Sequence, residues 1–103
     1  MKVTNKSLMF ALEQEVKIGD LTATLVAQVF YNPDEKNVDI EYMDICNTKF
    51  RGIEIKGYDN WKKFKAFHLE MGIDYAQLTN NEFDKIFTES AVKKEIANLK
   101  IKF

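Results

Sequence analysis

The 103-residue sequence contains one cysteine, one proline and four glycines. Because Cys46 is alone, the chain cannot form an internal disulfide, a zinc site built on paired cysteines or a C-x-x-C redox motif. No stretch approaches the roughly 18 consecutive apolar residues that a membrane-spanning helix needs, and the N-terminus lacks the apolar run of a signal peptide. We therefore expect a cytoplasmic protein without a membrane segment.

The residues that are present indicate a globular chain. Hydrophobic residues make up 46% and charged residues 30%, which predicts one α+β domain over residues 1–103 with no second domain or linker. The net charge of −1 is unevenly distributed, because residues 1–48 hold four lysines and eight acids, whereas residues 49–65 hold six basic residues and two acids. This reversal of sign suits a charged partner, but it also suits an ordinary mixed surface.

Two apolar runs, 8–18 and 21–31, flank Gly19-Asp20, and glycine at the first of two loop positions is typical of a type II′ hairpin. Pairing the residues on either side of this turn sets a register whose partners are mostly apolar: Ile18 with Leu21, Val16 with Ala23, Gln14 with Leu25, Leu12 with Ala27 and Phe10 with Val29. A helix over residues 8–16 is the alternative, since apolar residues there also recur at helical spacing.

A third strand is expected from Val38, after a turn over residues 32–37, and a fourth from about Phe50 to Lys56. A four-residue loop, 46–49, would join them and place Tyr42 opposite Ile53. The same register would place Glu41 opposite Glu54 on the outward face.

Two helical segments follow. Asp59 is expected to cap a first helix that ends at Gly72. The capping-box pattern from Thr79 to Glu82 predicts the start of a second, with a kink or restart at Ser90. Residues 99–103 alternate strictly and are either a fifth strand or a helix end. The predicted fold is a four- or five-stranded, mainly antiparallel meander with two or three helices packed on one face.

Four residues of the third and fourth strands suggest a metal-dependent nuclease, namely Asp39, Glu41, Glu54 and Lys56. Carboxylates on adjacent strands suit Mg²⁺, and a lysine can stabilise developing charge. The pattern Glu54-Ile55-Lys56 with an upstream acid is similar to the acid and E-x-K signature of restriction-type nucleases, over less than a fifth of the chain. A solvated strand face explains the same pattern, and we favour that interpretation.

The basic stretch supplies a second alternative, a nucleic-acid-binding surface formed by Lys56, Tyr58, Trp61, Lys62 and Lys65. Lysines can contact phosphates while an aromatic ring stacks on a base. Against this interpretation, the chain is slightly acidic and contains one arginine, and Trp61 suits a core position.

The remaining reactive residues suggest no catalytic site. His68 lies on the apolar stripe of the first helix, Cys46 has no basic neighbour in sequence, and no Gly-x-Ser-x-Gly motif or phosphate-binding glycine loop occurs. We expect no cofactor.

The leading hypothesis is a small, non-enzymatic protein-binding module, present as a monomer or a homodimer. Its binding residues would lie on the outer face of the sheet, where acidic side chains are mixed with apolar ones: Phe30, Asp39, Glu41, Met43 and Ile45. Fourteen lysines to one arginine indicate an AT-rich genome. The suggested role is a phage or mobile-element inhibitor or antidote that acts on a host or rival enzyme.

Overall fold

The computed structural model describes residues 2–3, 9–32 and 34–98, and these form one five-stranded sheet with three helices. Neighbouring strands are antiparallel throughout, in the order β1-β2-β3-β4-β5. The predicted α+β meander is therefore confirmed. The elements are β1 (Lys2–Val3), β2 (Met9–Ile18), β3 (Leu21–Asn32), β4 (Asn37–Phe50), β5 (Ile53–Glu54), α1 (Tyr58–Glu70), α2 (Tyr75–Ile86) and α3 (Glu89–Asn98).

The β2–β3 hairpin has the predicted register at every pair, from Ile18 with Leu21 to Phe10 with Val29. Gly19 has a φ of 59°, which a type II′ turn requires at its first central position. The alternative of a helix over residues 8–16 is therefore wrong, because the described part of that segment is strand.

The predicted loop over residues 46–49 is also wrong. The strand β4 continues through this segment to Phe50, which pairs with Ile53 of β5. The turn lies at Arg51-Gly52, whose φ values of 51° and 80° are those of a type I′ turn. Such a turn matches the twist of its two strands, so pairing ends at this dipeptide and not before residue 46.

Two irregularities in the β3–β4 register change which side of the sheet β4 presents. One extra residue, Met43, lies between the pairs that Tyr42 and Asp44 make with β3, and a second insertion lies at Asn47, whose φ is 52°. Each bulge shifts the alternation by one residue. Ile45 therefore faces the helices opposite Leu25, so its predicted place on the outer face is wrong.

The helix α1 begins after Gly57, which offers no side-chain cap, so Asp59 lies within the first turn and is not the predicted cap. Its predicted end is confirmed: Gly72 follows the C-cap Met71 with a φ of 84°, the conformation that glycine adopts most readily.

The helix α2 begins earlier than the capping-box pattern predicts. Asp74 is its N-cap and accepts a hydrogen bond from the Gln77 N–H at 3.0 Å, whereas Thr79 is buried inside the helix. After Ile86 the chain restarts as α3, with the Thr88 hydroxyl accepting from the Ala91 N–H, close to the predicted restart. The predicted strand over residues 99–103 lies outside the described residues.

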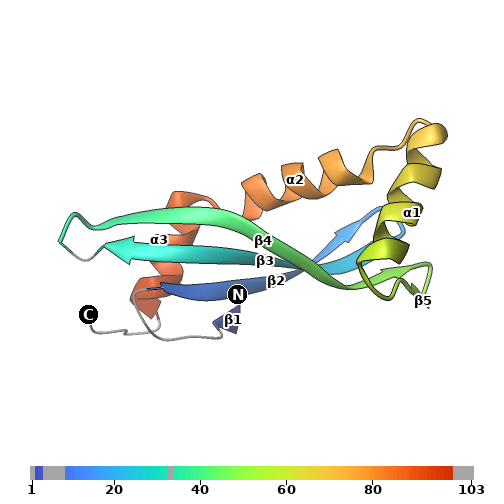
Figure 1. Cartoon of the computed structure of the whole chain (residues 1–103). Coiled ribbons are helices and arrows are strands. Elements are labelled where there is room, and N and C mark those ends of the chain that lie inside the picture. The colour runs from blue at the N-terminus through green and yellow to red at the C-terminus, as the bar shows by residue number, and fades with distance from the viewer. Residues whose placement is uncertain (1, 4–8, 33, 99–103) are drawn as a thin grey trace.

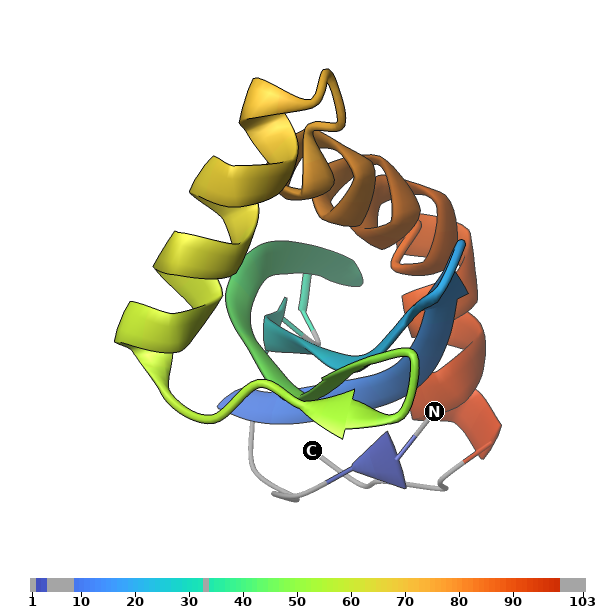
Figure 2. The same cartoon turned by 90° about the vertical axis from the view of Figure 1, so that its right-hand side faces the viewer.

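All three helices cover the same face of the sheet (Figures 1 and 2). Under α2 and α3 lies a larger core formed by Phe10, Leu12, Leu25, Ala27, Val29, Phe83, Phe87, Val92 and Ile96. Beneath α1 lies an aromatic core formed by Leu21, Trp61 and Tyr75, with Phe50, Phe64 and Ile55 packed against it. No helix among the described residues is long and apolar enough to cross a membrane. The molecule is elongated, with extents of 47 × 21 × 20 Å, and its β3–β4 hairpin projects past the helices (Figure 1).

Candidate functional site

Among the described residues, one edge of β4 has no strand partner over most of its length, and it is called the free edge below. It pairs with β3 from Asn37 to Phe50, but β5 pairs with it only at Lys49 and Phe50. The Ile55 N–H donates to the Thr48 carbonyl at 2.9 Å and closes the edge there. From Asn37 to Asn47, no described strand lies on the other side of β4.

The hairpin turns determine which peptide groups point toward this edge. In a hairpin with a two-residue turn, the residues on either side of the turn exchange hydrogen bonds, so Leu21 directs its N–H and C=O toward β2. Alternation along β3 then directs the peptide groups of Gln28 and Phe30 toward β4, where they face Glu41 and Asp39.

The same alternation applies to β4. Asp39 and Glu41 direct their N–H and C=O toward β3, so the residues between and beside them direct theirs toward the free side. The edge donors and acceptors therefore belong to Val38, Ile40 and Tyr42. These three carry their side chains on the helix-covered side, opposite Tyr31, Val29 and Ala27.

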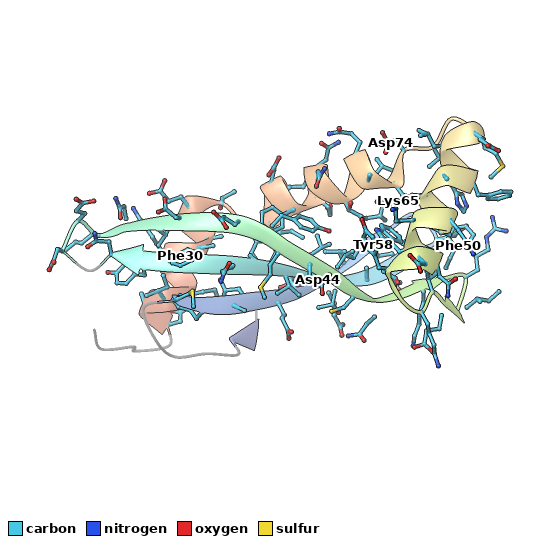
Figure 3. The ribbon with its side chains drawn as sticks, in the orientation of Figure 1. Phe30, Asp44, Phe50, Tyr58, Lys65 and Asp74 are labelled. Carbon is cyan, nitrogen blue, oxygen red and sulfur yellow. The ribbon has the colours of Figure 1, made fainter. Side chains whose placement is uncertain are left out.

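A cavity of about 640 Å³ lies where the free edge ends. It is bounded by residues 42–48 of β4, by residues 54–58, and by side chains from α1 and α2: Trp61, Lys65, Ala76 and Thr79. Figure 3 shows Tyr58 and Lys65 on α1 near the part of β4 that carries Asp44, while Phe30 lies toward the other end of the molecule. The free edge and the cavity are therefore continuous through Tyr42.

Aromatic rings and lysines meet at the wall of the cavity that α1 forms. The Lys65 ammonium lies 5.6 Å from the centre of the Trp61 ring, and the Lys62 ammonium lies 5.2 Å from that of Tyr58. Trp61 in turn stacks on Phe64 at 5.6 Å with an interplanar angle of 17°. Trp61 is buried and Tyr58 is exposed. The part of the wall that α1 contributes is thus aromatic with a cationic rim.

Two ionisable side chains on the β4 wall are held in their neutral forms. Burial raises the pKa of Tyr42 above its ordinary value of 10.0, although a side-chain hydrogen bond with Thr79 opposes this effect. Burial, followed by repulsion from Asp44 and Glu13, raises the pKa of the Cys46 thiol above 9.0. A thiol with a raised pKa is a weak nucleophile at neutral pH.

A row of carboxylates lies beside the free edge on the outer face. Asp39, Glu41 and Asp44 are all exposed, opposite Phe30, Gln28 and Val26 of β3. Within residues 9–32 and 34–98, no lysine or arginine forms an ion pair with any of the three. Among the described residues, the charges of this row therefore lack an ion-pair partner.

The predicted protein-binding residues lie along β4, with one exception. Asp39 and Glu41 lie beside the free edge, Met43 and Ile45 line the cavity, and Phe30 lies on β3 opposite Asp39. The outer face is less apolar than predicted, because Val26 is only 7% exposed.

The predicted nucleic-acid residues gather at the same cavity. Lys56, Tyr58, Trp61 and Lys65 line it, while Lys62 lies beside Tyr58. The predicted nuclease residues are not assembled in the predicted way. Glu41 lies opposite Gln28, Glu54 pairs with Lys49, and Lys56 forms an ion pair with Glu54 at 3.8 Å. No group of three or more His, Cys, Asp or Glu that could hold a metal occurs in the described part of the chain.

Sequence reasoning missed several residues of the cavity, among them Tyr42, Ala76 and Thr79. The sequence pattern predicts only a strand-pairing role for Tyr42 and a helix-capping role for Thr79. Its hydroxyl instead donates to the Ala76 carbonyl at 2.9 Å, a bond that is compatible with a position inside a helix. A helix start at Asp74, which the sequence also permits, would have placed Ala76 and Thr79 on the inward side.

Comparisons with known proteins give no relative. No protein family, curated protein or solved structure matches this chain.

Proposed function

We propose that this protein is a non-enzymatic binding module that takes an extended segment of a partner protein as an additional strand on β4. The observation that carries this proposal is a free strand edge that leads into a cavity. An added strand gains main-chain hydrogen bonds from the edge, and adjacent pockets select its side chains. A role as an inhibitor or antidote toward another enzyme is the specific form that the sequence suggests.

The cavity supports this function because it offers an apolar site at the end of the edge. Its volume lies within the range of ligand pockets. Tyr42, Ile45 and Trp61 would contact an apolar side chain of the bound segment, while Lys65 lies within reach of a polar one. Anchors of this kind commonly dominate binding energy in protein interfaces.

The decisive variant is Ile40→Pro, with Ile40→Ala as its matched control. Both remove the isoleucine side chain, but only proline also removes an N–H that faces the free edge. Each tagged protein is incubated with nuclease-treated extract of its native host, and the bound proteins are identified by mass spectrometry. We expect a stoichiometric partner with wild type and Ile40→Ala and its loss with Ile40→Pro. Equal retention by both variants would contradict strand addition.

A second pair of variants tests the cavity without altering the strand. Ala76→Leu narrows the cavity, whereas Asn80→Leu places the same side chain on an exposed position of α2. We expect Ala76→Leu to weaken partner binding by about tenfold, the effect of losing one well-packed anchor. Asn80→Leu should bind as wild type does, and loss of binding in both variants would contradict a role for the cavity.

Nucleic-acid binding is the second candidate, because four of its five predicted residues line one cavity. Burial of Trp61 leaves Tyr58 as the exposed ring for base stacking. This function requires an affinity for single-stranded nucleic acid that decreases with salt and decreases further in Lys62→Ala and Lys65→Ala. A protein partner that survives nuclease treatment would instead favour the binding module.

A further inference from the structure

We propose that residues 99–103 of a second copy of this chain bind to the free edge of β4 at residues 38–42. The inference uses the edge on which the proposed function rests, and it names one occupant. The two segments have complementary patterns: Val38-Asp39-Ile40-Glu41-Tyr42 alternates apolar and acidic residues, and Leu99-Lys100-Ile101-Lys102-Phe103 alternates apolar and basic ones.

Charge complementarity is the first argument. Asp39 and Glu41 lie on the outer face and form no ion pair with a described lysine or arginine. Because their peptide groups point toward β3, an added strand meets them in non-hydrogen-bonded pairs, where facing side chains are closest. Opposite charges stabilise such pairs. Antiparallel addition with Ile101 opposite Ile40 places Lys102 and Lys100 opposite Asp39 and Glu41.

The apolar positions agree with the same register. Val38 and Ile40 are half-buried at the rim of the larger core, and the Tyr42 ring lies 4.9 Å from that of Phe83. An added strand would place Phe103, Ile101 and Leu99 beside them on the helix-covered side. Strand addition would thus extend the larger core past its present edge.

The position of α3 favours a second copy as the source of the segment. In both views α3 ends on the side of the sheet where β1 and β2 lie, opposite the β4 edge (Figures 1 and 2). Direct pairing of two β4 strands is disfavoured, because it would bring the carboxylates of Asp39, Glu41 and Asp44 from both copies together. Exchange of the 99–103 segment avoids this repulsion.

The test is a charge exchange, measured by sedimentation equilibrium of the full chain over a range of concentrations. Wild type should form a dimer of twice the 12.0 kDa chain mass. Lys100→Glu with Lys102→Glu should weaken dimerisation by about tenfold or more, and so should Asp39→Lys with Glu41→Lys. The protein with all four substitutions should recover an affinity near that of wild type.

The matched control is Lys63→Glu with Lys94→Glu, which makes the same change of charge at two exposed helix positions. This control should dimerise as wild type does. Ile40→Pro should prevent dimerisation that Ile40→Ala retains.

Three results would overturn the inference: a monomer at every concentration, a dimer whose affinity does not change on charge reversal, or a four-substitution protein whose dimerisation affinity is not restored. None of these results decides the proposed function. That proposal fails on a separate observation, namely equal capture of a host partner by Ile40→Pro and Ile40→Ala.

Discussion

The two cores of the molecule differ in how completely they exclude solvent. In the larger core, Leu12, Leu25 and Val92 are fully buried, and strand and helix residues enclose them on all sides. The aromatic core has one fully buried member, Leu21, and Trp61 borders the cavity. The larger core is therefore closed to solvent, whereas the aromatic core forms part of the wall of the cavity.

The largest effect is expected in the larger core. Leu25→Ala should lower the free energy of unfolding by about 2–5 kcal/mol, because it leaves a cavity at a fully enclosed site. Ile53→Ala is the control, since Ile53 is 73% exposed, and it should change stability by less than about 0.5 kcal/mol. Denaturant titration followed by far-UV circular dichroism measures both. A small effect at Leu25 would contradict full enclosure of this site.

Replacing an alanine with leucine should affect stability differently in the two regions. Ala27 is fully buried in the larger core, so Ala27→Leu should lower the free energy of unfolding by roughly 1–3 kcal/mol through overpacking. Ala76 borders the cavity, so Ala76→Leu should cost less than about 1 kcal/mol, because the new side chain enters open space. Equal losses in the two variants would contradict an open cavity beside α2.

The cation beside Trp61 provides a smaller test. Trp61 is the single tryptophan, so its fluorescence reports on the aromatic core alone. Lys65→Met removes an ammonium 5.6 Å from the ring and should lower stability by about 0.5–1 kcal/mol. The variant should also decrease quenching of this fluorescence by iodide, because loss of the ammonium beside the ring weakens the attraction of the anionic quencher. Unchanged quenching would show that the Lys65 ammonium does not lie beside Trp61 in solution.

The smallest effect concerns pH. In the folded state the pKa values of Cys46 and Tyr42 lie above their ordinary values of 9.0 and 10.0. Folding therefore favours the protonated forms. Their contribution to the free energy of unfolding is fully present below the ordinary pKa values and is lost as pH rises through the raised pKa values of the folded state. Tyr42→Phe should reduce the loss of stability above pH 10, as measured by thermal unfolding in reducing buffer. An identical alkaline loss in wild type and Tyr42→Phe would contradict this account.

The sequence predicted the β2–β3 hairpin in detail because one short turn determines every later pair. Gly19 sets the turn, and a shift of one residue would expose an entire apolar face, so few registers compete. The predicted face of Ile45 was wrong because each bulge in the β3–β4 pairing adds one residue without a clear sequence signal. Met43 and Asn47 shift the alternation, and simple period-2 counting then places Ile45 on the wrong face.

The site was only partly predictable for the same reason. Asp39, Glu41 and Met43 were found because acidic and apolar residues alternate over this segment. The cavity depends on where two helices lie relative to β4, and the helix boundary near Asp74 was misjudged. Thr79 matched a capping box, but burial of its methyl group inside α2 outweighed that local preference.

Amide hydrogen exchange of β4, followed by NMR, tests most directly whether one edge of this strand is unpaired. The variant Lys100→Glu with Lys102→Glu is used, so that residues 99–103 of another copy do not cover the edge. We expect fast exchange at Val38, Ile40 and Tyr42 and slow exchange at Asp39 and Glu41. Only the N–H groups of Asp39 and Glu41 donate to β3. Slow exchange at all five residues would show that the edge of β4 is already paired and would contradict the account.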